Sequence, residues 1–361
     1  MKKILHLLWS GSIGGIENLC LSIGRRKPQE NLFCFVHEGG VIAGQMEKEG
    51  LDVELLNLRK WDVLALYKYL SLKIRHMEID CIIVHHDSGL LWLVSIFLKK
   101  KYPGFKVYIY AHCSYKDFIR NKTDRIVFLM TAKWVDGIIA ISKYVKKSIV
   151  EQHAFLEKTI FVIYNGIDTT RFTLQREKSY KDTSGKIRLI YVGRLIEEKG
   201  LQLLLSSIVE NALENKVILT IVGDGPYRSQ LEKLTLNFHL NNCVSFAGSQ
   251  EDVLCYLKES DIFVHPAIWE EGFGITIIES MALGVPCIAF NRGAISEIIC
   301  NEVDGFIVNE VSGKALGSRI TELCPMVGTD YWIKICEAAI NKSTLFSVDR
   351  TIEKIESLIE E

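Results

Sequence analysis

The stretch that decides the fold runs from His265 to Pro286 and reads HPAIWEEGFGITIIESMALGVP. An apolar run ends at His265, a loop with Gly272 and Gly274 follows, and an apolar helical segment leads to Pro286 and the next apolar run. Glycines at a helix start let the backbone approach a neighbour or a ligand closely. Strand, loop, helix and strand form the repeating unit of a parallel sheet covered by helices.

Two glutamates give this stretch its chemistry. Glu279 lies inside an otherwise apolar helix, and leaving a buried carboxylate without partners costs several kcal/mol. Ribose hydroxyls would supply such partners. Glu271 precedes the helix, where it could accept hydrogen bonds from a sugar while the amides of Gly272–Gly274 face an anionic group. The plainer alternatives are a helix N-cap for Glu271 and a satisfied core carboxylate for Glu279.

Short β-rich apolar runs alternate with longer helical patterns on both sides of this stretch. This alternation predicts an α/β protein with two doubly wound parallel sheets. The expected strands are Ile4–Leu8, Leu32–Val36, Cys81–His85, Lys106–Ala111, Gly137–Ile141, Ile187–Val192, Val217–Val222, Asp261–His265, Val285–Ala289 and Gly305–Val308.

The chain of 361 residues is longer than one domain needs, so we expect two. The predicted N-terminal domain covers 1–168, a polar linker without periodicity covers 169–186, and the C-terminal domain covers 187–346. The last segment, 347–361, is predicted to be an amphipathic helix that packs back on the N-terminal domain.

Composition excludes several classes of protein. Hydrophobic residues make up 48% and charged residues 24% of the chain, which is typical of a globular protein. The longest apolar run, Leu90–Leu98, is too short to span a bilayer, and the N-terminus lacks the pattern of a signal peptide. The ten cysteines are scattered, and no His or Cys cluster has metal-ligand spacing. We therefore expect a cytoplasmic protein with reduced thiols and no metal.

The charge is unevenly distributed. Residues 1–170 carry 24 Lys and Arg against 17 Asp and Glu, whereas the rest of the chain carries 19 against 27. A basic first half suits an anionic partner or a membrane surface, although solvated surface lysines explain it equally well. The candidate membrane contacts are Lys99–Lys101, Lys143, Lys146 and Lys147.

Three further motifs follow expected strands: one in the first half of the chain, at 10–17, and two in the second half, at 193–199 and 223–226. The turn Ser10–Glu17 contains Gly14 and Gly15 and opens a helix, but it lacks the Gly-x-Gly-x-x-Gly spacing of a dinucleotide dehydrogenase. Gly193, Arg194 and Lys199 place two cations where a diphosphate could lie.

Both motifs of the second half have structural alternatives. Arg194 and Lys199 could instead be surface cations paired with Glu197 and Glu198. The turn at 223–226, Gly-Asp-Gly-Pro, either shapes the pocket or only turns the chain, and the structural role is favoured.

Together these residues resemble the retaining glycosyltransferases of family 4, which have the GT-B fold. The resemblance rests on the Glu-x7-Glu motif in its Gly-Phe-Gly frame, on Gly193-Arg194-Leu195 with Lys199-Gly200, and on the turn at 223–226. It extends to the motifs at 14–17, 165–168, 296–299 and 304–306. The fold it implies has two Rossmann-like domains that face each other across a cleft.

The resemblance also implies the site. Arg194 and Lys199 would hold the donor diphosphate, Glu279 the ribose and Glu271 the transferred sugar, while His112 would lie by the reaction centre. His85 and His86 are possible lining residues. The expected catalytic residues are Glu271, His112, Arg194 and Lys199, and the expected donor-binding residues are Gly14, Gly15, Gly193, Arg194, Lys199, Gly225, Gly272, Phe273, Gly274, Ile275 and Glu279.

The expected reaction is a metal-independent sugar transfer with retained configuration, from a nucleotide-sugar donor, with a UDP-sugar favoured, to a glycan or lipid-linked acceptor in cell-surface polysaccharide synthesis. Peripheral attachment to the inner face of the plasma membrane is a further expectation, and no nucleic acid partner is expected. The alternatives are a nucleotide-sugar epimerase of the same fold and a non-catalytic partner subunit of a glycosyltransferase.

Overall fold

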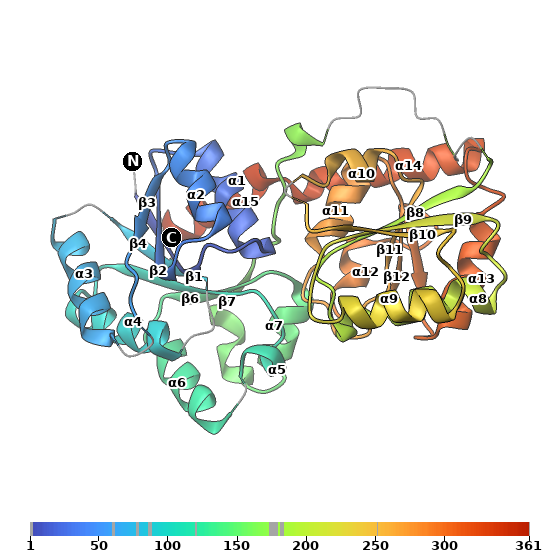
Figure 1. The fold of residues 1–361 in the computed structure, drawn as a ribbon. Helices are drawn as coiled ribbons and strands as arrows, with labels where there is room; N and C mark the ends of the chain where they lie inside the picture. Colours follow the sequence, from blue (N-terminus) through green and yellow to red (C-terminus); the bar gives the residue numbers. More distant parts are fainter. Residues whose placement is uncertain are drawn as a thin grey trace. The chain divides into compact units, whose positions relative to one another are not determined.

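The chain forms two compact units. The computed structural model describes residues 3–59, 62–76, 79–85, 89–119, 121–172, 180, 184–250 and 252–360. One unit comprises Met1–Asp168 and Ser347–Glu361, and the other comprises Thr169–Phe346. Each contains one parallel sheet with helices on both faces (Figure 1), which confirms the expected α/β fold of two doubly wound sheets.

The first unit has a seven-stranded sheet in the order β3-β2-β1-β4-β5-β6-β7. The order reverses between β1 and β4, because the chain first winds toward β3 and then returns to the other side of β1. Ligands of such sheets bind at this reversal, beyond the carboxyl ends of the strands. The strands are β1 (Ile4–Ser10), β2 (Asn31–Glu38), β3 (Asp52–Leu55), β4 (Cys81–Val84), β5 (Lys106–Ala111), β6 (Gly137–Ala140) and β7 (Ile160–Val162).

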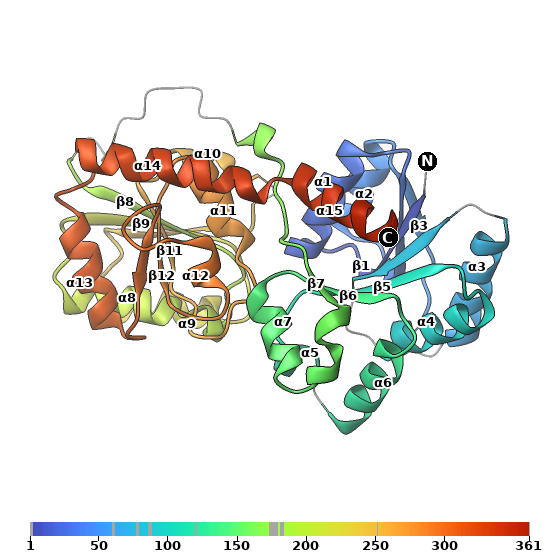
Figure 2. The same cartoon turned by 180° about the vertical axis from the view of Figure 1, so that it is seen from behind.

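Helices cover both faces of this sheet. The views in Figures 1 and 2 agree that α1, α2 and α15 lie on one face and that α4, α6 and α7 lie on the other. The elements are α1 (Gly15–Arg26), α2 (Val41–Lys48), α3 (Val63–Arg75), α4 (Gly89–Lys101), α5 (Tyr115–Phe118), α6 (Lys122–Ala132), α7 (Lys143–Val150), the 3-10 helix η1 (Ala154–Thr159) and α15 (Val348–Glu360).

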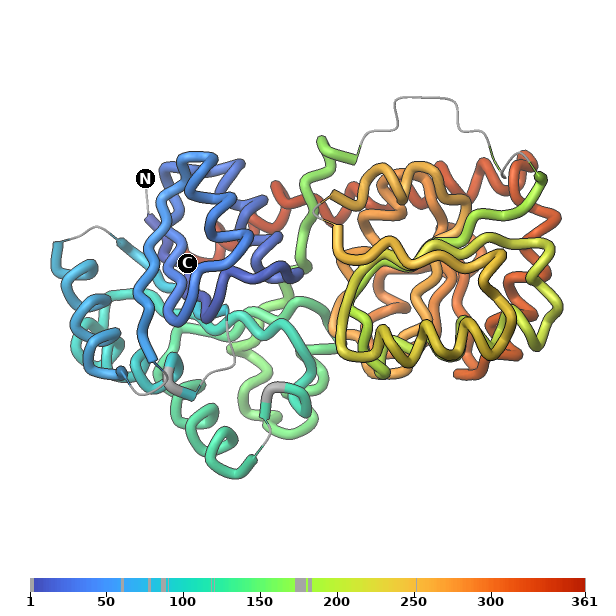
Figure 3. The backbone as a smooth tube through the Cα atoms, in the orientation of Figure 1, coloured from blue at the N-terminus to red at the C-terminus, as the bar shows by residue number. Residues whose placement is uncertain are grey.

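The C-terminal helix α15 belongs to the first unit, although it follows the second in sequence. Its apolar face is buried, including Ile352, Ile355 and Ile359. Figure 3 shows the red C-terminal segment returning to the side of the blue α1. The hydroxyl of Tyr108 donates to the carbonyl of Leu358 at 2.9 Å, which fixes the end of α15 to β5.

The second unit has a six-stranded sheet in the order β10-β9-β8-β11-β12-β13, with its reversal between β8 and β11. Helices α8, α9 and α13 lie on one face, and α10, α11 and α14 lie on the other (Figures 1 and 2). The strands are β8 (Ile187–Val192), β9 (Val217–Val222), β10 (Val244–Gly248), β11 (Ile262–His265), β12 (Cys287–Phe290) and β13 (Phe306–Val308). The helices are η2 (Thr169–Arg171), η3 (Glu197–Lys199), α8 (Leu201–Glu210), α9 (Arg228–Asn237), α10 (Leu254–Lys258), α11 (Ile275–Ala282), α12 (Ile295–Ile298), α13 (Gly313–Leu323), α14 (Asp330–Ser343) and η4 (Thr344–Phe346).

All ten expected strands are present, and three strands were missed. The missed strands are β3, β7 and β10, and each of them lies at the edge of its sheet. They are short and partly exposed, with only one buried residue in β10 and none in β3. An edge strand with polar or exposed positions leaves no continuous apolar run in the sequence.

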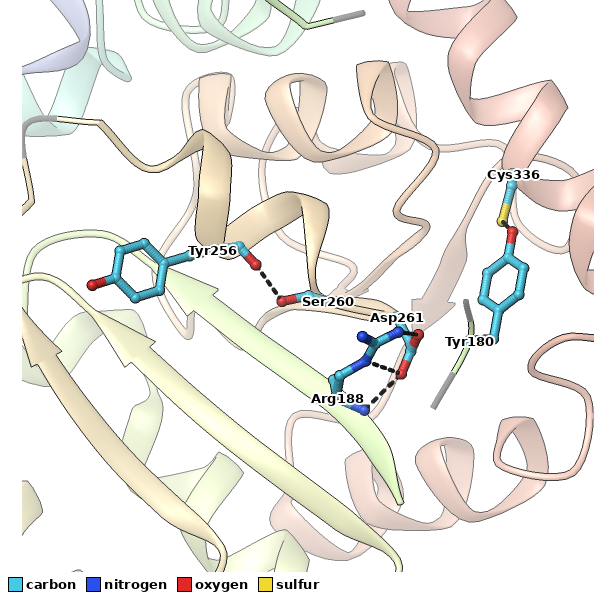
Figure 4. Close-up of polar contacts among 6 residues, drawn as sticks. All are labelled: Tyr180, Arg188, Tyr256, Ser260, Asp261 and Cys336. Atoms are coloured by element: carbon cyan, nitrogen blue, oxygen red, sulfur yellow. Dashed lines mark hydrogen bonds and ion pairs between the residues drawn. The ribbon is translucent and has the colours of Figure 1, made fainter. Parts of the chain in front are cut away.

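A buried ion pair ties the two central strands of the second unit together (Figure 4). The side chain of Asp261, which precedes β11, is fully buried and pairs with Arg188 of β8. Its carboxylate accepts hydrogen bonds from the backbone N–H of Arg188 at 2.8 Å and from the guanidinium at 3.1 and 2.8 Å. One carboxylate thus fixes the start of both strands that flank the reversal of strand order.

Replacing this carboxylate should destabilise the second unit. We expect Asp261→Ala to lower the free energy of unfolding by about 2 to 4 kcal/mol, because the Arg188 guanidinium and amide lose their buried partner. Urea denaturation followed by tryptophan fluorescence measures the change. The control is Glu232→Ala, which removes an exposed ion pair with Arg228 and should change the free energy of unfolding far less. Equal losses in the two variants would contradict the assignment.

Candidate functional site

The predicted site of the second unit lies where its strand order reverses. The segment after β8 carries Gly193, Arg194 and Lys199, and the segment after β11 carries Glu271 and the start of α11. Because β8 and β11 are neighbours and parallel, both segments leave the same edge of the sheet. Topology therefore brings together residues that are more than 70 positions apart in the sequence, such as Lys199 and Glu271.

Glycines allow the two segments to touch backbone to backbone. A Cβ on Gly200 would lie 1.9 Å from the carbonyl oxygen of Pro266, and the amide of Ile268 donates to the carbonyl of Glu198 at 2.9 Å. Gly200 also has a φ of 72°, a left-handed conformation that glycine adopts without strain. The 3-10 turn that carries Lys199 is thereby fixed against the segment that carries Glu271.

The turn after β9 packs against the turn after β8 in the same way. A Cβ on Gly223 would lie 1.9 Å from the carbonyl oxygen of Gly193, and one on Gly225 would lie 2.3 Å from that of Leu195. The amide of Leu195 donates to the carbonyl of Asp224 at 2.9 Å. This close packing supports the structural role favoured for the turn, and it positions the backbone around Arg194.

A cluster of three donors surrounds one oxygen of Glu271. Its Oε2 accepts hydrogen bonds from Lys199 Nζ at 2.6 Å, from Trp269 Nε1 at 3.2 Å and from His265 Nε2 at 3.2 Å. The ammonium of Lys199 also lies 4.8 Å from the centre of the Trp269 ring, which allows a cation–π contact. Within the described part of the chain, the hydrogen bonds of the Glu271 carboxylate all use Oε2 and none uses Oε1.

The charges of this cluster follow from its surroundings. Burial alone would raise the pKa of Glu271, but Lys199 and the hydrogen bond from His265 outweigh burial and hold the pKa well below its usual range. Burial lowers the pKa of His265, and Glu271 offsets that shift only in part. At neutral pH, Glu271 is therefore ionised and His265 is a neutral donor through Nε2.

Sequence reasoning missed His265 and Trp269 as parts of this cluster. Both lie within the decisive stretch, but their contact with Glu271 depends on how the loop folds back. The backbone sets this fold: the carbonyl of Glu271 accepts from the amide of Ala294 at 2.8 Å, and a Cβ on Gly293 would lie 2.1 Å from that carbonyl.

The N-cap alternative for Glu271 is wrong. The N-cap of α11 is Gly274, with a φ of 95°, and no side chain caps the helix. Glu271 instead directs its carboxylate to Lys199, His265 and Trp269. The alternative that pairs Lys199 with Glu197 or Glu198 is also not observed, because the partner of Lys199 is Glu271.

Glu279 lies in the second turn of α11 and differs from Glu271 in its electrostatics. Burial raises the pKa of its carboxyl to about 7, and the charge of Arg171 opposes that shift. Among the described residues, no hydrogen bond or ion pair of Glu279 is found. The alternative of a satisfied core carboxylate therefore finds no support in the described part of the chain.

The remaining expected donor-binding residues flank these two glutamates. Phe273 is buried with its ring edge against Phe346, so only its backbone can face a ligand. Gly272 and Gly274 lie on either side of it, and Ile275 is the first residue of α11. The side chain of Arg194 is exposed.

In the first unit, the glycine turn opens a helix as expected. Gly14 is the N-cap of α1 and Gly15 is its first residue. A Cβ on Gly14 would lie 2.4 Å from Oε2 of Glu17, so the glycine leaves room for that carboxylate. Burial raises the pKa of Glu17, which brings a partly buried acid to the start of the helix.

His112 directly follows β5 and contacts a second histidine. Its Nε2 lies 3.0 Å from Nδ1 of His85, which directly follows β4. His85 Nε2 in turn lies 2.8 Å from Nδ1 of His6 in β1, a histidine that the sequence analysis did not select. His86 lies outside the described residues.

One group of possible metal ligands occurs among the described residues: His6, Cys20 and His85, with ligand atoms within 4.8 Å of one another. The sequence spacing did not predict this group, since its members come from three separate elements. The 2.8 Å between the histidine nitrogens is a hydrogen-bond distance. Two nitrogens bound to one tetrahedral zinc ion would lie about 3.3 Å apart. The arrangement therefore fits a hydrogen bond better than a metal.

None of the helices within the described ranges has the length and apolar character to cross a membrane. Two lysines named above as membrane contacts have internal partners. Lys99 pairs with Asp136 at 2.8 Å and donates to the carbonyl of Phe105, and Lys146 donates to the carbonyl of Ile160. Lys147 is largely exposed.

Comparison with curated proteins finds glycosyltransferases. The chain is 28% identical over 265 residues to an uncharacterised glycosyltransferase of Methanocaldococcus jannaschii, over 72% of this chain and 62% of that protein. It is 27% identical over 335 residues to the UDP-Gal:alpha-D-GlcNAc-diphosphoundecaprenol alpha-1,3-galactosyltransferase of Escherichia coli, over 85% of this chain and 84% of that protein. The match with the Methanocaldococcus jannaschii protein spans less than two thirds of that protein's length.

Solved structures share the fold. HepE from Anabaena, solved in complex with UDP, superposes with a TM-score of 0.84 at 20% identity and covers 99% of both chains. The same protein in complex with UDP-glucose superposes with a TM-score of 0.84 at 20% identity over 100% of both chains.

Two family models match consecutive parts of the chain. The model described as Glycosyltransferase Family 4 matches residues 13–171, and the model described as Glycosyl transferases group 1 matches residues 173–325. The two matches correspond to the two sheets and together span most of the sequence. The chain belongs to the family 4 glycosyltransferases and has their GT-B fold.

Proposed function

We propose that this protein is a retaining, metal-independent glycosyltransferase that moves a sugar from a nucleotide-diphosphate sugar to a hydroxyl of a glycan or lipid-linked acceptor. A UDP-sugar is the favoured donor. The single observation that carries the proposal is the cluster of Lys199, His265 and Trp269 around Glu271, at the reversal of strand order in the second unit. This is where open parallel sheets bind nucleotides.

The cluster suits the charges of sugar transfer. When the bond to the donor phosphate breaks, negative charge grows on the diphosphate and positive charge grows at the sugar carbon. Lys199 has N–H groups beyond the one given to Glu271, and with Arg194 and the amides at the start of α11 it would stabilise the phosphate charge. The ionised Glu271 would accept a sugar hydroxyl through Oε1.

These cations would take the part that a divalent metal plays elsewhere. We propose that the acceptor attacks from the face that the phosphate leaves and that the leaving phosphate oxygen takes its proton, which retains the configuration. Glu279 would bind the ribose hydroxyls. Nucleotide complexes of HepE and the name of the Escherichia coli relative support a UDP-sugar donor and an acceptor linked to a lipid diphosphate.

A surface of the first unit supports a lipid-linked acceptor. Exposed apolar side chains lie on α3, α4 and α6 and in the turn that follows α6, and we call them the apolar patch: Leu64, Phe97, Ile126, Met130 and Trp134. Lysines adjoin it, since Lys100 Nζ lies 4.6 Å from the centre of the Trp134 ring. Exposed aromatic and apolar residues beside lysines favour the interface of an anionic membrane. We therefore propose peripheral attachment through this patch.

Two other functions make different predictions. An epimerase of the same fold would convert the nucleotide sugar without an acceptor, so product analysis without acceptor tests it. A non-catalytic subunit would have no need of a charged cluster around Glu271, and its failure to bind a nucleotide diphosphate in calorimetry would reveal it.

Removing either member of the central ion pair should abolish most of the transfer. We expect Glu271→Ala and Lys199→Ala each to lower kcat by about 100- to 1000-fold, because each removes a preorganised charge from the transition state. Release of UDP, GDP or ADP from the matching sugar donors, measured with EDTA present, identifies the donor and tests the need for a metal. Glu322→Ala, which removes an exposed partner of Arg319, is the control. Near-normal turnover in a folded Glu271 or Lys199 variant would refute its role.

The pKa of Glu279 predicts a pH dependence of nucleotide binding. Below pH 7 the ligand-free carboxyl is protonated, whereas ribose hydroxyls donate best to the ionised form. Binding therefore releases a proton, and UDP affinity should rise as pH increases from 5.5 to 7. Calorimetry in buffers of different ionisation enthalpy measures the proton release. Glu279→Gln should bind more weakly and lose that pH dependence, while an unchanged slope would assign the proton to another group.

The apolar patch predicts binding to lipid. We expect the double variant Phe97→Ser, Trp134→Ser to sediment less with vesicles that contain anionic phospholipid, because about 0.8 kcal/mol is lost for each CH₂ group no longer buried. Phe155→Ser is the matched control, since Phe155 is 62% exposed but lies on η1. Equal sedimentation of the wild type with neutral and anionic vesicles would contradict the proposal.

A further inference from the structure

We propose that Asn31, His6 and His85 form a neutral hydrogen-bond chain that fixes the ring of His112 and places its proton on Nε2. These three are positioning residues, since they act through His112. The part of His112 in sugar transfer rests on the proposed function, whereas the hydrogen-bond chain does not.

The chain runs diagonally across four neighbouring strands. Asn31 begins β2, His6 lies in β1, and His85 and His112 directly follow β4 and β5, which are adjacent in the order β2-β1-β4-β5. In the sheet register, Asn31 pairs with Ile4, two residues before His6, and His6 pairs with Ile83, two residues before His85. Residues two apart point to the same face of a sheet. Each step therefore moves one strand sideways and one side chain toward the carboxyl edge.

The distances make every link a hydrogen bond. His6 Nε2 lies 2.8 Å from Asn31 Oδ1, His6 Nδ1 lies 2.8 Å from His85 Nε2, and His85 Nδ1 lies 3.0 Å from His112 Nε2. The ring centres of His6 and His85 lie 5.1 Å apart and those of His85 and His112 lie 5.3 Å apart, with angles of 30° and 24° between the ring planes. His6 is 1% exposed, His85 2% and Asn31 3%, so water does not compete for these bonds.

One backbone carbonyl decides the direction of all the bonds. The carbonyl of Lys27 can only accept, so the group of Asn31 that lies 2.9 Å from it is the amide Nδ2, and Oδ1 faces His6. Oδ1 can only accept, so His6 carries its proton on Nε2. With His6 neutral, its Nδ1 accepts from Nε2–H of His85, and Nδ1 of neutral His85 then accepts from Nε2–H of His112.

Burial keeps the chain neutral. It lowers the pKa of His6 to about 4 against a smaller opposing effect of the Asn31 hydrogen bond, and it lowers the pKa of His85 well below its usual range, with His6 and His112 adding to that effect. The thiol of Cys20, whose pKa burial raises, is also neutral. Near neutral pH, His6 and His85 are therefore both neutral, and each carries its proton on Nε2.

The identity of the first residue shows what the chain does. A carboxylate at position 31 would favour a charged His6 and allow a proton to move along the rings. The amide of Asn31 is neither an acid nor a base at ordinary pH, so no proton leaves at that end. The chain therefore orients the ring of His112 through Nε2 and sends no proton to it from the Asn31 end.

Nitrogen NMR on the full-length protein with ¹⁵N-labelled histidine tests the proton positions. We expect His6, His85 and His112 all to show protonated Nε2 and unprotonated Nδ1 at pH 7.5, with scalar coupling between the nitrogens of each linked pair. A protonated Nδ1 in His6 or His85, or the absence of coupling, would overturn the proposal. Stoichiometric zinc in the purified protein would also overturn it, because a metal would replace the bond between His6 and His85.

Two variants of His85 separate positioning from simple packing. His85→Phe keeps a ring but offers no acceptor, and we expect it to lower kcat about 10- to 100-fold while the donor KM changes less than about twofold. His85→Gln can donate to His6 and accept from His112, so it should recover most of the loss. If the two variants were equally impaired, the residue would serve packing only.

A buried histidine outside the chain provides the matched control. His153 bonds to the hydroxyl of Tyr115 at 2.7 Å and is 5% exposed. We expect His153→Phe to leave both kcat and the His112 nitrogen signals unchanged. Because the NMR measurement needs no substrate, a wild type with the expected signals but no sugar transfer would refute the proposed function and leave the chain intact.

Discussion

The close approach of backbone segments at one edge of the second sheet is the constraint on which the rest of the site depends. At four positions a glycine lies so near a carbonyl group that a Cβ would fall 1.9 to 2.3 Å from its oxygen: Gly200, Gly223, Gly225 and Gly293. No side chain can occupy such a space. The loops after β8, β9, β11 and β12 are thereby packed closely against one another, and this packing brings Lys199 to Glu271.

Two glutamates eight residues apart show how this arrangement sets chemistry. Burial raises the pKa of both carboxyls, but Glu271 has Lys199 and His265 beside it and stays ionised. Burial raises the pKa of Glu279 to about 7; among the described residues the charge of Arg171 opposes this rise and that of Asp252 adds to it. The first carboxylate is thus a permanent charge that needs no ligand. The second is only partly charged near pH 7, so hydrogen-bond donors of a ligand would favour its ionised form and couple its ionisation to binding.

The sequence predicted every central strand and missed three of the four edge strands. Central strands are buried on both faces, so their apolar runs are continuous. The edge strand β13 was also expected, since two of its three residues are buried and apolar. The edge strands β3, β7 and β10 pair on one side only and carry exposed positions that hide them from a search for apolar runs. These strands can be identified only from their pairing with a neighbouring strand, and that pairing depends on the tertiary structure.

The same distinction explains which site residues were predictable. Lys199 and Glu271 stand in recognisable motifs with glycines around them. His265 and Trp269 contact Glu271 only because the loop turns back on itself, and His6 occupies a position in β1 that resembles any buried strand residue. A polar side chain inside an apolar strand was the available signal for His6, since a buried imidazole must have partners.

The two units therefore use opposite means to prepare polar groups. In the second, Lys199 and Glu271 offset each other's desolvation by direct pairing, and in the proposed reaction their charges would oppose those that grow as the donor phosphate departs. In the first, Asn31, His6 and His85 are neutral, and their effect is geometric: they determine which nitrogen of His112 carries the proton. A charged side chain at position 31 would act electrostatically on every nearby group, because Coulomb interactions are long-ranged. A neutral chain of hydrogen bonds acts on the ring of His112 alone. Such an arrangement suits a His112 that orients a hydroxyl of the substrate, since in the proposed reaction the leaving phosphate oxygen takes the proton.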